Sequence, residues 1–262
     1  MKTEKMSRIV VKVGSNVLTT EKGKLNITRL SSLVDQIAWM KEHGYEVILV
    51  TSGAVACGRQ ELKVDHELDS AEQRQLFSAM GQVKLINLYY DLFREYNIHI
   101  GQVLTMKENF VPGEQYTNQR NCMAIMLDNG VIPIVNENDT VCLTELMFTD
   151  NDELSGLIAQ MMGAETLILL SNIDGIYTGN PKDPESEIIR KVKPEDNLDK
   201  YIQTSKSSAG RGGMESKYHT ARTVAASGIR VMIANGNREN ILPALLTDSE
   251  STIHTEFIPL NS

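Results

Sequence analysis

The chain has 262 residues, a net charge of −8 and a hydrophobic fraction of 41%, which is an ordinary composition for a globular protein. A negative net charge argues against a nucleic-acid-binding surface, which is usually basic. The sequence holds no apolar run of about 18 residues that could cross a membrane, and its first residues do not resemble a leader. We therefore expect a cytoplasmic protein with a buried core, organised as one large α/β domain or two smaller ones.

Cysteine and histidine usage gives no sign of a disulfide framework or a metal centre. Cys57, Cys122 and Cys142 have no CxxC spacing, so reduced and partly buried thiols are favoured over a catalytic role. The five histidines form no HExxH or similar signature, and no metal held by protein side chains is predicted.

Short β-branched apolar segments alternate along the chain with segments of helical periodicity. We predict strands at 8–13, 46–51, 99–104, 131–135, 166–171 and 229–234, and helices at about 30–44, 70–96, 118–129, 153–162 and 214–227. Residues 140–148 are predicted to form a small hairpin or extended excursion, and 182–208 mixed surface structure. Strands that are nearly all apolar and alternate with helices predict a mainly parallel sheet covered on both faces.

Polar clusters follow several predicted strands at the point where each strand ends. They are Gly14-Ser15-Asn16, Ser52-Gly53, residues 136–139 and Ser171-Asn172. Ligands of open α/β sheets bind in the crevice beyond the carboxyl ends of the strands. We therefore expect these clusters to converge on one site.

Two glycine-containing segments carry a lysine that could bind phosphate. Lys12, in a strand of Val and Ile, could simply reach solvent, but Gly14 would let a backbone amide approach a phosphate closely. The segment 210–217 has three glycines, Arg211 and Lys217. It is either a flexible surface loop or, as we favour, a phosphate-binding loop at a helix start. The Walker pattern GxxxxGK[ST] is absent from the sequence.

Asp150 and Asp152 flank Asn151 at the start of a predicted helix. Acidic residues are common helix caps, but two aspartates exceed what a cap requires. Carboxylates near cations can orient lysines or hold a magnesium–nucleotide complex. Together with the two lysines and glycine loops, this pair predicts a site that transfers phosphoryl groups.

These motifs together resemble the amino acid kinase superfamily, and within it the kinases of glutamate, over nearly the whole chain. The matching segments are 11–15 (VKVGS), 50–59 (VTSGAVACGR), 135–139 (VNEND), 150–152 (DND) and 212–217 (GGMESK). The first and last are shared across the superfamily. The SGAxxxGR, NEND and DND motifs are more specific to the glutamate kinases.

The resemblance implies a three-layer αβα sandwich forming a single kinase domain over 1–262, with an acceptor lobe at about 1–160 and a nucleotide lobe at about 161–262. It implies transfer of the ATP γ-phosphoryl group to the side-chain carboxylate of L-glutamate, the first step of proline biosynthesis, with Mg²⁺ accompanying ATP. It further implies a dimer or tetramer inhibited by L-proline. Many bacterial members carry a C-terminal PUA domain, which we do not expect here.

The resemblance also assigns roles to residues. Lys12 and Lys217 would hold the transferring phosphoryl group, and Asp152 would orient them. The implied acceptor-binding residues are Ser52, Gly53, Asn136, Asp139, Asp150 and Asn151. The implied nucleotide-binding residues are Lys12, Gly14, Ser171, Asn172, Arg211, Gly212, Gly213, Met214 and Lys217.

The sequence departs from the family pattern in two places. Ser171-Asn172 stands where the family usually has Ser/Thr-Asp, with Asp174 two residues on, and Arg211 stands where many members have Thr. Two alternatives remain open. One is a superfamily enzyme with another carboxylate, carbamate or phosphate acceptor, and the other is a non-catalytic metabolite-binding regulator.

Overall fold

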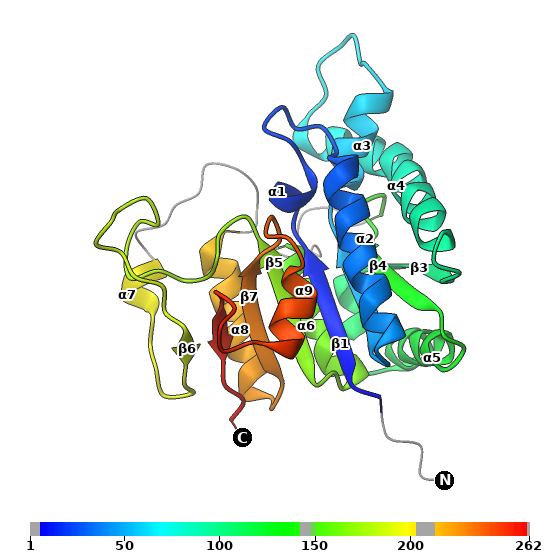
Figure 1. Ribbon diagram of the computed structural model, residues 1–262. Coiled ribbons are helices and arrows are strands. Elements are labelled where there is room, and N and C mark those ends of the chain that lie inside the picture. The colour runs from blue at the N-terminus through cyan, green and yellow to red at the C-terminus, as the bar shows by residue number, and fades with distance from the viewer. Residues whose placement is uncertain (1–5, 142–147, 149, 203–212, 261–262) are drawn as a thin grey trace.

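The computed structural model describes residues 6–141, 148, 150–202 and 213–260. Within them, eight strands form one sheet in the order β3-β4-β2-β1-β5-β7-β8-β6 (Figure 1). Only β7 and β8 pair antiparallel among these strands. The strands are β1 (Arg8–Val13), β2 (Glu46–Thr51), β3 (Ile100–Thr105), β4 (Ile132–Glu137), β5 (Thr166–Ser171), β6 (Lys191–Val192), β7 (Arg230–Asn235) and β8 (Thr255–Phe257).

Helices cover both faces of this sheet. They are α1 (Ser15–Leu18), α2 (Ile27–Glu42), α3 (Ala54–Glu61), α4 (Ser70–Arg94), η1 (Lys107–Phe110), α5 (Glu114–Asp128), α6 (Asn151–Met162), α7 (Asp199–Ile202), α8 (Met214–Ala226) and α9 (Ile241–Thr247). Successive strand residues point to opposite faces. Val10 accordingly packs in a core with α5, α6 and α8, whereas Ile9 and Val11 pack in a second core with α2, α4 and α9. The predicted mainly parallel, three-layer α/β fold is confirmed.

The order of the strands places a crevice at the end of β1. From β1 the chain moves to β2 on one side and returns to β5 on the other, so β1 pairs in parallel with both. At such a reversal, loops leave neighbouring strands in opposite directions and open a space for a ligand. The polar clusters after β1, β2, β4 and β5 all reach this edge of the sheet.

Helices α3 and α4 pack unusually close, and glycine explains why. A Cβ atom built on Gly81 would lie 1.8 Å from the carbonyl oxygen of Ala54, and one on Gly58 would lie 1.9 Å from that of Phe77. Gly81 therefore marks close packing, and α4 is continuous through it. Asp69 begins this helix with a capping box that includes Glu72. The long helix α4 thereby presents its first turns to the crevice.

The boundaries of the central strands agree with the sequence predictions, and the periphery differs. Strands β1, β2 and β5 begin and end at the predicted residues, whereas β4 continues through the polar residues Asn136 and Glu137. Helices α1, η1, α7 and α9 and strands β6 and β8 were not predicted. Most of the hairpin predicted at 140–148 lies outside the described residues. No helix among the described residues is long and apolar enough to cross a membrane.

Candidate active site

A cavity of about 1110 Å³ opens at the carboxyl ends of β1, β2, β4 and β5. Its walls contain Lys12 and Gly14 from the first cluster, Ser52 and Gly53 from the second, Asn136 and Asp139 from the third, and Ser171 and Asn172 from the fourth. Asp150, Asn151, Gly213, Met214 and Lys217 complete the walls. The structure therefore brings together the predicted site residues that it describes, except Asp152, which lies beneath the cavity floor. Arg211 and Gly212 lie outside the described residues.

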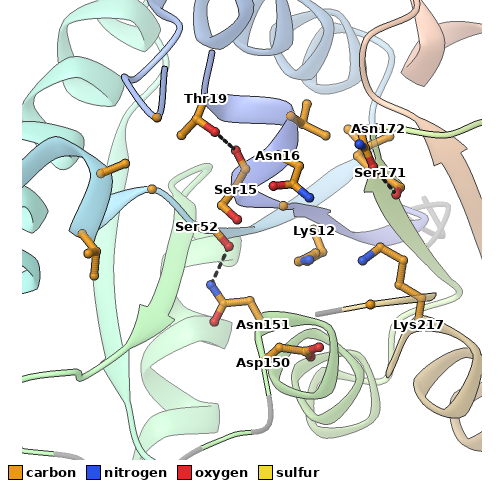
Figure 2. Close-up of a pocket in the computed structure, with 18 of the residues that line it drawn as sticks. Lys12, Ser15, Asn16, Thr19, Ser52, Asp150, Asn151, Ser171, Asn172 and Lys217 are labelled. Atoms are coloured by element: carbon orange, nitrogen blue, oxygen red, sulfur yellow. Dashed lines mark hydrogen bonds between the residues drawn. The ribbon is translucent and has the colours of Figure 1, made fainter. Parts of the chain in front are cut away.

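Asp152 is fully buried between the two lysines. Lys12 Nζ lies 2.6 Å from Asp152 Oδ1, and Lys217 Nζ lies 2.9 Å from Asp152 Oδ2. Figure 2 shows the two lysine side chains beside each other, one from β1 and the other from α8. One carboxylate thus fixes two ammonium groups at the cavity wall, and the three side chains carry a net positive charge that suits an anionic ligand.

Burial and mutual contact alter the proton affinity of this group. Burial lowers the pKa of Lys12, and the neighbouring Asp152 opposes that shift. Burial acts to raise the pKa of Asp152, but Lys12 and Lys217 together outweigh it and the pKa is lowered. Asp152 is therefore a charged carboxylate at neutral pH, and it is the contact that favours the charged form of Lys12.

Asp150 begins helix α6 and also faces the cavity. Its Oδ1 accepts hydrogen bonds from the backbone amides of Asp152 and Glu153, at 2.9 and 3.1 Å, so it caps the helix. Its buried Oδ2 has no hydrogen-bond partner among the described residues. Burial, followed by the charge of Asp152, raises the pKa of Asp150. A side-chain hydrogen bond with Ser216 opposes this rise, so Asp150 joins the starts of α6 and α8 at the cavity wall.

Asn151 links three elements through one amide nitrogen. Its Nδ2 donates to the carbonyl oxygen of Thr51, to Ser52 Oγ and to Asn136 Oδ1, at 2.9, 2.9 and 3.1 Å. Asn136 in turn donates to Gln82 Oε1 of α4 at 3.0 Å. These contacts hold the ends of β2 and β4 at a fixed distance from the start of α6, which positions polar groups along one wall of the cavity.

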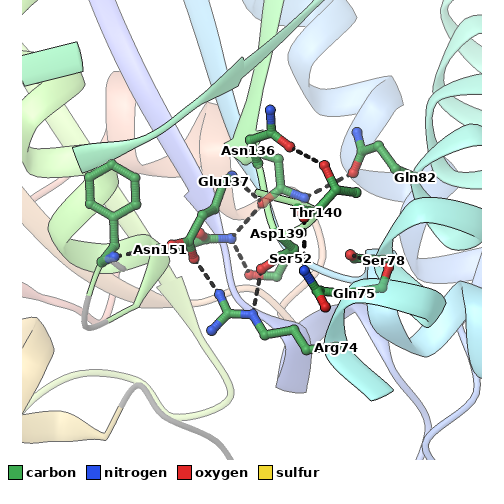
Figure 3. Close-up of polar contacts among 12 residues, drawn as sticks. Ser52, Arg74, Gln75, Ser78, Gln82, Asn136, Glu137, Asp139, Thr140 and Asn151 are labelled. Carbon is green, nitrogen blue, oxygen red and sulfur yellow. Dashed lines mark hydrogen bonds and ion pairs between the residues drawn. The ribbon is translucent and has the colours of Figure 1, made fainter. Parts of the chain in front are cut away.

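The third cluster has a charged partner that the sequence analysis did not identify. Arg74 of α4 donates from Nε to Asp139 Oδ1 at 2.5 Å and from Nη2 to Glu137 Oε2 (Figure 3). Glu137 Oε1 accepts from the backbone amide of Phe148 at 3.1 Å. Gln82, Arg74 and Glu137 are therefore polar residues of the site that the sequence reasoning missed. Glu137 lies in a quoted motif, but in the sequence Arg74 and Gln82 look like ordinary polar residues of a long helix.

The opposite wall of the cavity has the features of an anion site. A Cβ atom on Gly14 would lie 3.3 Å from Lys12 Nζ, so glycine leaves room beside that ammonium group. Helix α8 begins at Gly213 without a side-chain cap, which leaves its first amides available to an anion. Asp174 does not take the place of the family's aspartate at the nucleotide side, because both of its oxygens accept hydrogen bonds from Arg238, at 2.6 and 2.9 Å.

The chemistry of the cavity fits magnesium that enters with a nucleotide. No group of three or more His, Cys, Asp or Glu side chains that could hold a metal ion occurs among the described residues. Mg²⁺ commonly takes only one or two protein carboxylates and completes its shell with phosphates and water. Asp150, which lines the cavity, supplies a carboxylate of this kind.

Comparison with known proteins decides the family. The family model described as "Amino acid kinase family" matches residues 7–235. The chain belongs to the amino acid kinase family. It is 60% identical to "Glutamate 5-kinase" of Bacteroides thetaiotaomicron, covering 98% of this chain and 71% of that protein. It is 46% identical to "Glutamate 5-kinase" of Chlorobaculum tepidum, covering 91% and 66%. Within the family the chain is therefore related to the glutamate 5-kinases.

Solved structures of distant relatives share the fold. A carbamate kinase from Giardia lamblia bound to AMP-PNP aligns with a TM-score of 0.69 at 16% identity, covering 97% of this chain and 99% of that one. An isopentenyl phosphate kinase substrate complex aligns with a TM-score of 0.67 at 17% identity, covering 95% and 99%. At these identities the likeness supports the architecture and not the acceptor.

Proposed function

We propose that this protein transfers the γ-phosphoryl group of ATP to the side-chain carboxylate of L-glutamate, giving L-glutamyl 5-phosphate and ADP. A glutamate oxygen forms the new bond to phosphorus, and the bond between phosphorus and the bridging oxygen breaks with its electron pair left on ADP. The acceptor carboxylate is ionised at neutral pH, so no base has to remove a proton. The observation that carries the proposal is the pair of buried lysines held by Asp152 in the cavity of a glutamate 5-kinase relative.

Lys12 and Lys217 are the proposed catalytic residues. Phosphoryl transfer requires mainly positioning and stabilisation of charge on the transferring oxygens. Two ammonium groups, fixed on opposite oxygens of one carboxylate, can contact those oxygens without reorganising during the reaction. Asp152 acts as the positioning residue, because its buried carboxylate faces the lysines and not the cavity. Mg²⁺, when bound with ATP, would neutralise phosphate charge beside Asp150.

The two substrates would enter from different sides of the β1 crevice. We place glutamate against the ends of β2 and β4 and the start of α6, with Ser52, Gly53, Asn136, Asp139, Asp150 and Asn151 around it. We place ATP against β5 and the start of α8, with Gly14, Ser171, Asn172, Gly213, Met214 and the unplaced Arg211 and Gly212. Apart from Gly14, which lies at the end of β1 between the two sides, this proposed arrangement follows the expected acceptor half at about 1–160 and nucleotide half at about 161–262.

The acceptor is tested by measuring ADP release with a panel of candidate substrates. Glutamate, N-acetylglutamate, aspartate, carbamate and UMP are compared at equal concentrations with Mg²⁺ and ATP. We expect release to depend on glutamate, and to be lost in Lys217→Ala but retained in Lys193→Ala, which removes an exposed lysine. Faster ADP release with another acceptor would show that this acceptor, and not glutamate, is the substrate. Binding of a metabolite without ATP and without turnover would favour a regulator.

A further inference from the structure

Arg74 forms the charged boundary of the acceptor side of the cavity. Its guanidinium group contacts Asp139 through Nε and Glu137 through Nη2 (Figure 3). The Arg74 side chain is 19% exposed, and those of Glu137 and Asp139 are 4% and 10% exposed. A planar guanidinium can bridge two carboxylates in a fixed geometry, which a single-point ammonium group cannot do.

This arrangement sets both the charge and the shape of the cluster. Among the described residues, one guanidinium beside two carboxylates carries a net charge of −1, which matches a ligand that carries one ammonium group. Burial raises the pKa of Glu137, and the neighbouring Arg74 opposes that shift, so the arginine favours the ionised form of Glu137. Asp139 is consequently held in one orientation, with part of its carboxylate facing the cavity.

Contacts around Arg74 extend this order to neighbouring segments. Gln75, the next residue of α4, donates to the carbonyl oxygen of Thr140 at 3.0 Å. Glu137 accepts from the backbone amide of Phe148 at 3.1 Å, close to the start of α6. The first turns of α4 therefore hold the segment after β4 through Gln75. Through Arg74 and Glu137 they also hold Phe148, which lies just before α6.

We propose that Arg74 is a positioning and specificity-determining residue, which holds Asp139 for the α-ammonium group of the acceptor and limits the cluster to one net negative charge. The inference rests on the proposed function and deepens it, because it names the group that selects an α-amino acid over the corresponding simple dicarboxylic acid. Arg74 acts through Asp139 and does not itself contact the reacting atoms.

The test is a double-mutant cycle between Arg74→Met and Asp139→Asn. The KM for L-glutamate, kcat, the Kd of ATP and the inhibition constant of glutarate, which lacks the α-ammonium group, are measured for each variant. We expect Arg74→Met to raise the KM for glutamate by about tenfold or more, as expected for loss of one charge-assisted contact. The inhibition constant of glutarate should rise by less than the KM for glutamate, and the Kd of ATP should change by less than about twofold, within the usual additivity error of distant sites.

Coupling distinguishes indirect action from direct contact. If Arg74 acts through Asp139, the double variant has nearly the same KM as Asp139→Asn alone, because residues that act through one contact are not additive. Additive effects would overturn the inference and place Arg74 on the substrate itself. An equal loss of glutarate and glutamate binding would also overturn it, since that result indicates a merely structural role.

Two further variants keep the test decisive. Arg94→Met removes an exposed arginine of the same helix, whose side chain is 62% exposed, and should leave every constant unchanged. If Arg74→Met does not fold, the cycle is run with Arg74→Lys, which keeps the charge but cannot bridge both carboxylates and should give an intermediate KM. Absence of glutamate turnover by the unmodified protein would overturn the proposed function, whereas normal turnover with no selective Arg74 effect would overturn this inference alone.

Discussion

The ammonium groups of Lys12 and Lys217 contact opposite oxygens of a single carboxylate, at 2.6 and 2.9 Å. Lys12 is the last residue but one of β1 and Lys217 lies in the first turns of α8, so Asp152 joins two elements that are distant in sequence. All three side chains are buried. A buried ion pair adds little net stability by itself, and here both ammonium groups line the cavity.

Replacing either lysine should reduce the rate of the chemical step. We expect Lys12→Ala and Lys217→Ala each to lower kcat by a factor on the order of 10² or more, because each removes a charge that stabilises the transferring group. The KM for glutamate should change less. Steady-state kinetics with Lys193→Ala as the matched control checks this, and near-normal kcat in either variant would remove that lysine from the mechanism.

The pH dependence of nucleotide binding should report the contact between Lys12 and Asp152. Burial lowers the pKa of Lys12 from its ordinary value of 10.5, and Asp152 opposes that shift. ATP binding should therefore weaken as the pH rises through the lowered pKa, when Lys12 loses its proton and its charge. Asp152→Asn removes the opposing charge, so this weakening of ATP binding, the alkaline limb of the pH profile, should begin at lower pH.

The Kd of ATP, measured by calorimetry from neutral to alkaline pH, tests this shift while turnover is slow. Asp199→Asn, at an exposed position of α7, is the control and should leave the limb in place. A limb at the same pH in Asp152→Asn and in the unmodified protein would show that Asp152 does not control the charge of Lys12.

The contact between α3 and α4 should not tolerate a methyl group. Gly81→Ala would place a Cβ atom 1.8 Å from the carbonyl oxygen of Ala54. We expect it to lower the free energy of unfolding by about 1–3 kcal/mol through overpacking, although alanine is the better helix former. Urea unfolding measures the change, with Val83→Ala at a position that is 60% exposed as the control. An unchanged or increased free energy of unfolding would contradict this packing.

L-Proline should inhibit by competing with glutamate. The family resemblance implies an inhibitor site that overlaps the acceptor pocket, and the acceptor-side residues converge on one cavity. When two ligands exclude each other, a higher concentration of one displaces the other. Raising glutamate should therefore relieve the inhibition and restore the rate. A grid of initial rates over both concentrations is the measurement. Insensitivity to millimolar proline, or inhibition that persists at saturating glutamate, would separate the two sites.

The fold was predictable where periodicity and burial agree. Strand β5 is buried throughout, and its apolar run defined both ends. Strand β4 was predicted to end at Val135, because its last two residues are the polar Asn136 and Glu137. Both are buried by tertiary contacts with Gln82, Asn151 and Arg74. Helix α9 contains Pro243, a residue that weakens a helix prediction even where the first turn accommodates it.

The site was predictable where a motif carried it and not where a long-range pair did. Lys12, Asp152 and Lys217 stand in short segments with glycines or paired carboxylates, and the structure places them in contact. Arg74 lies in a helix of mixed polar residues, and nothing local distinguishes it from exposed Arg94 of the same helix. Its partners are 63 and 65 residues away in sequence, so the tertiary contacts at the end of β4 identify it.

Trapping the product with hydroxylamine tests the proposed reaction most directly. An acyl phosphate reacts with hydroxylamine to give a hydroxamate, whereas a phosphate ester does not. With ATP, Mg²⁺, L-glutamate and hydroxylamine, we expect one γ-glutamyl hydroxamate for each ADP formed, and at least a hundredfold less of both products with Lys217→Ala, on the order of magnitude set by loss of one charge at the transferring group. ADP release without hydroxamate, or a hydroxamate that forms equally well with Lys217→Ala, would contradict transfer to the glutamate carboxylate at this site.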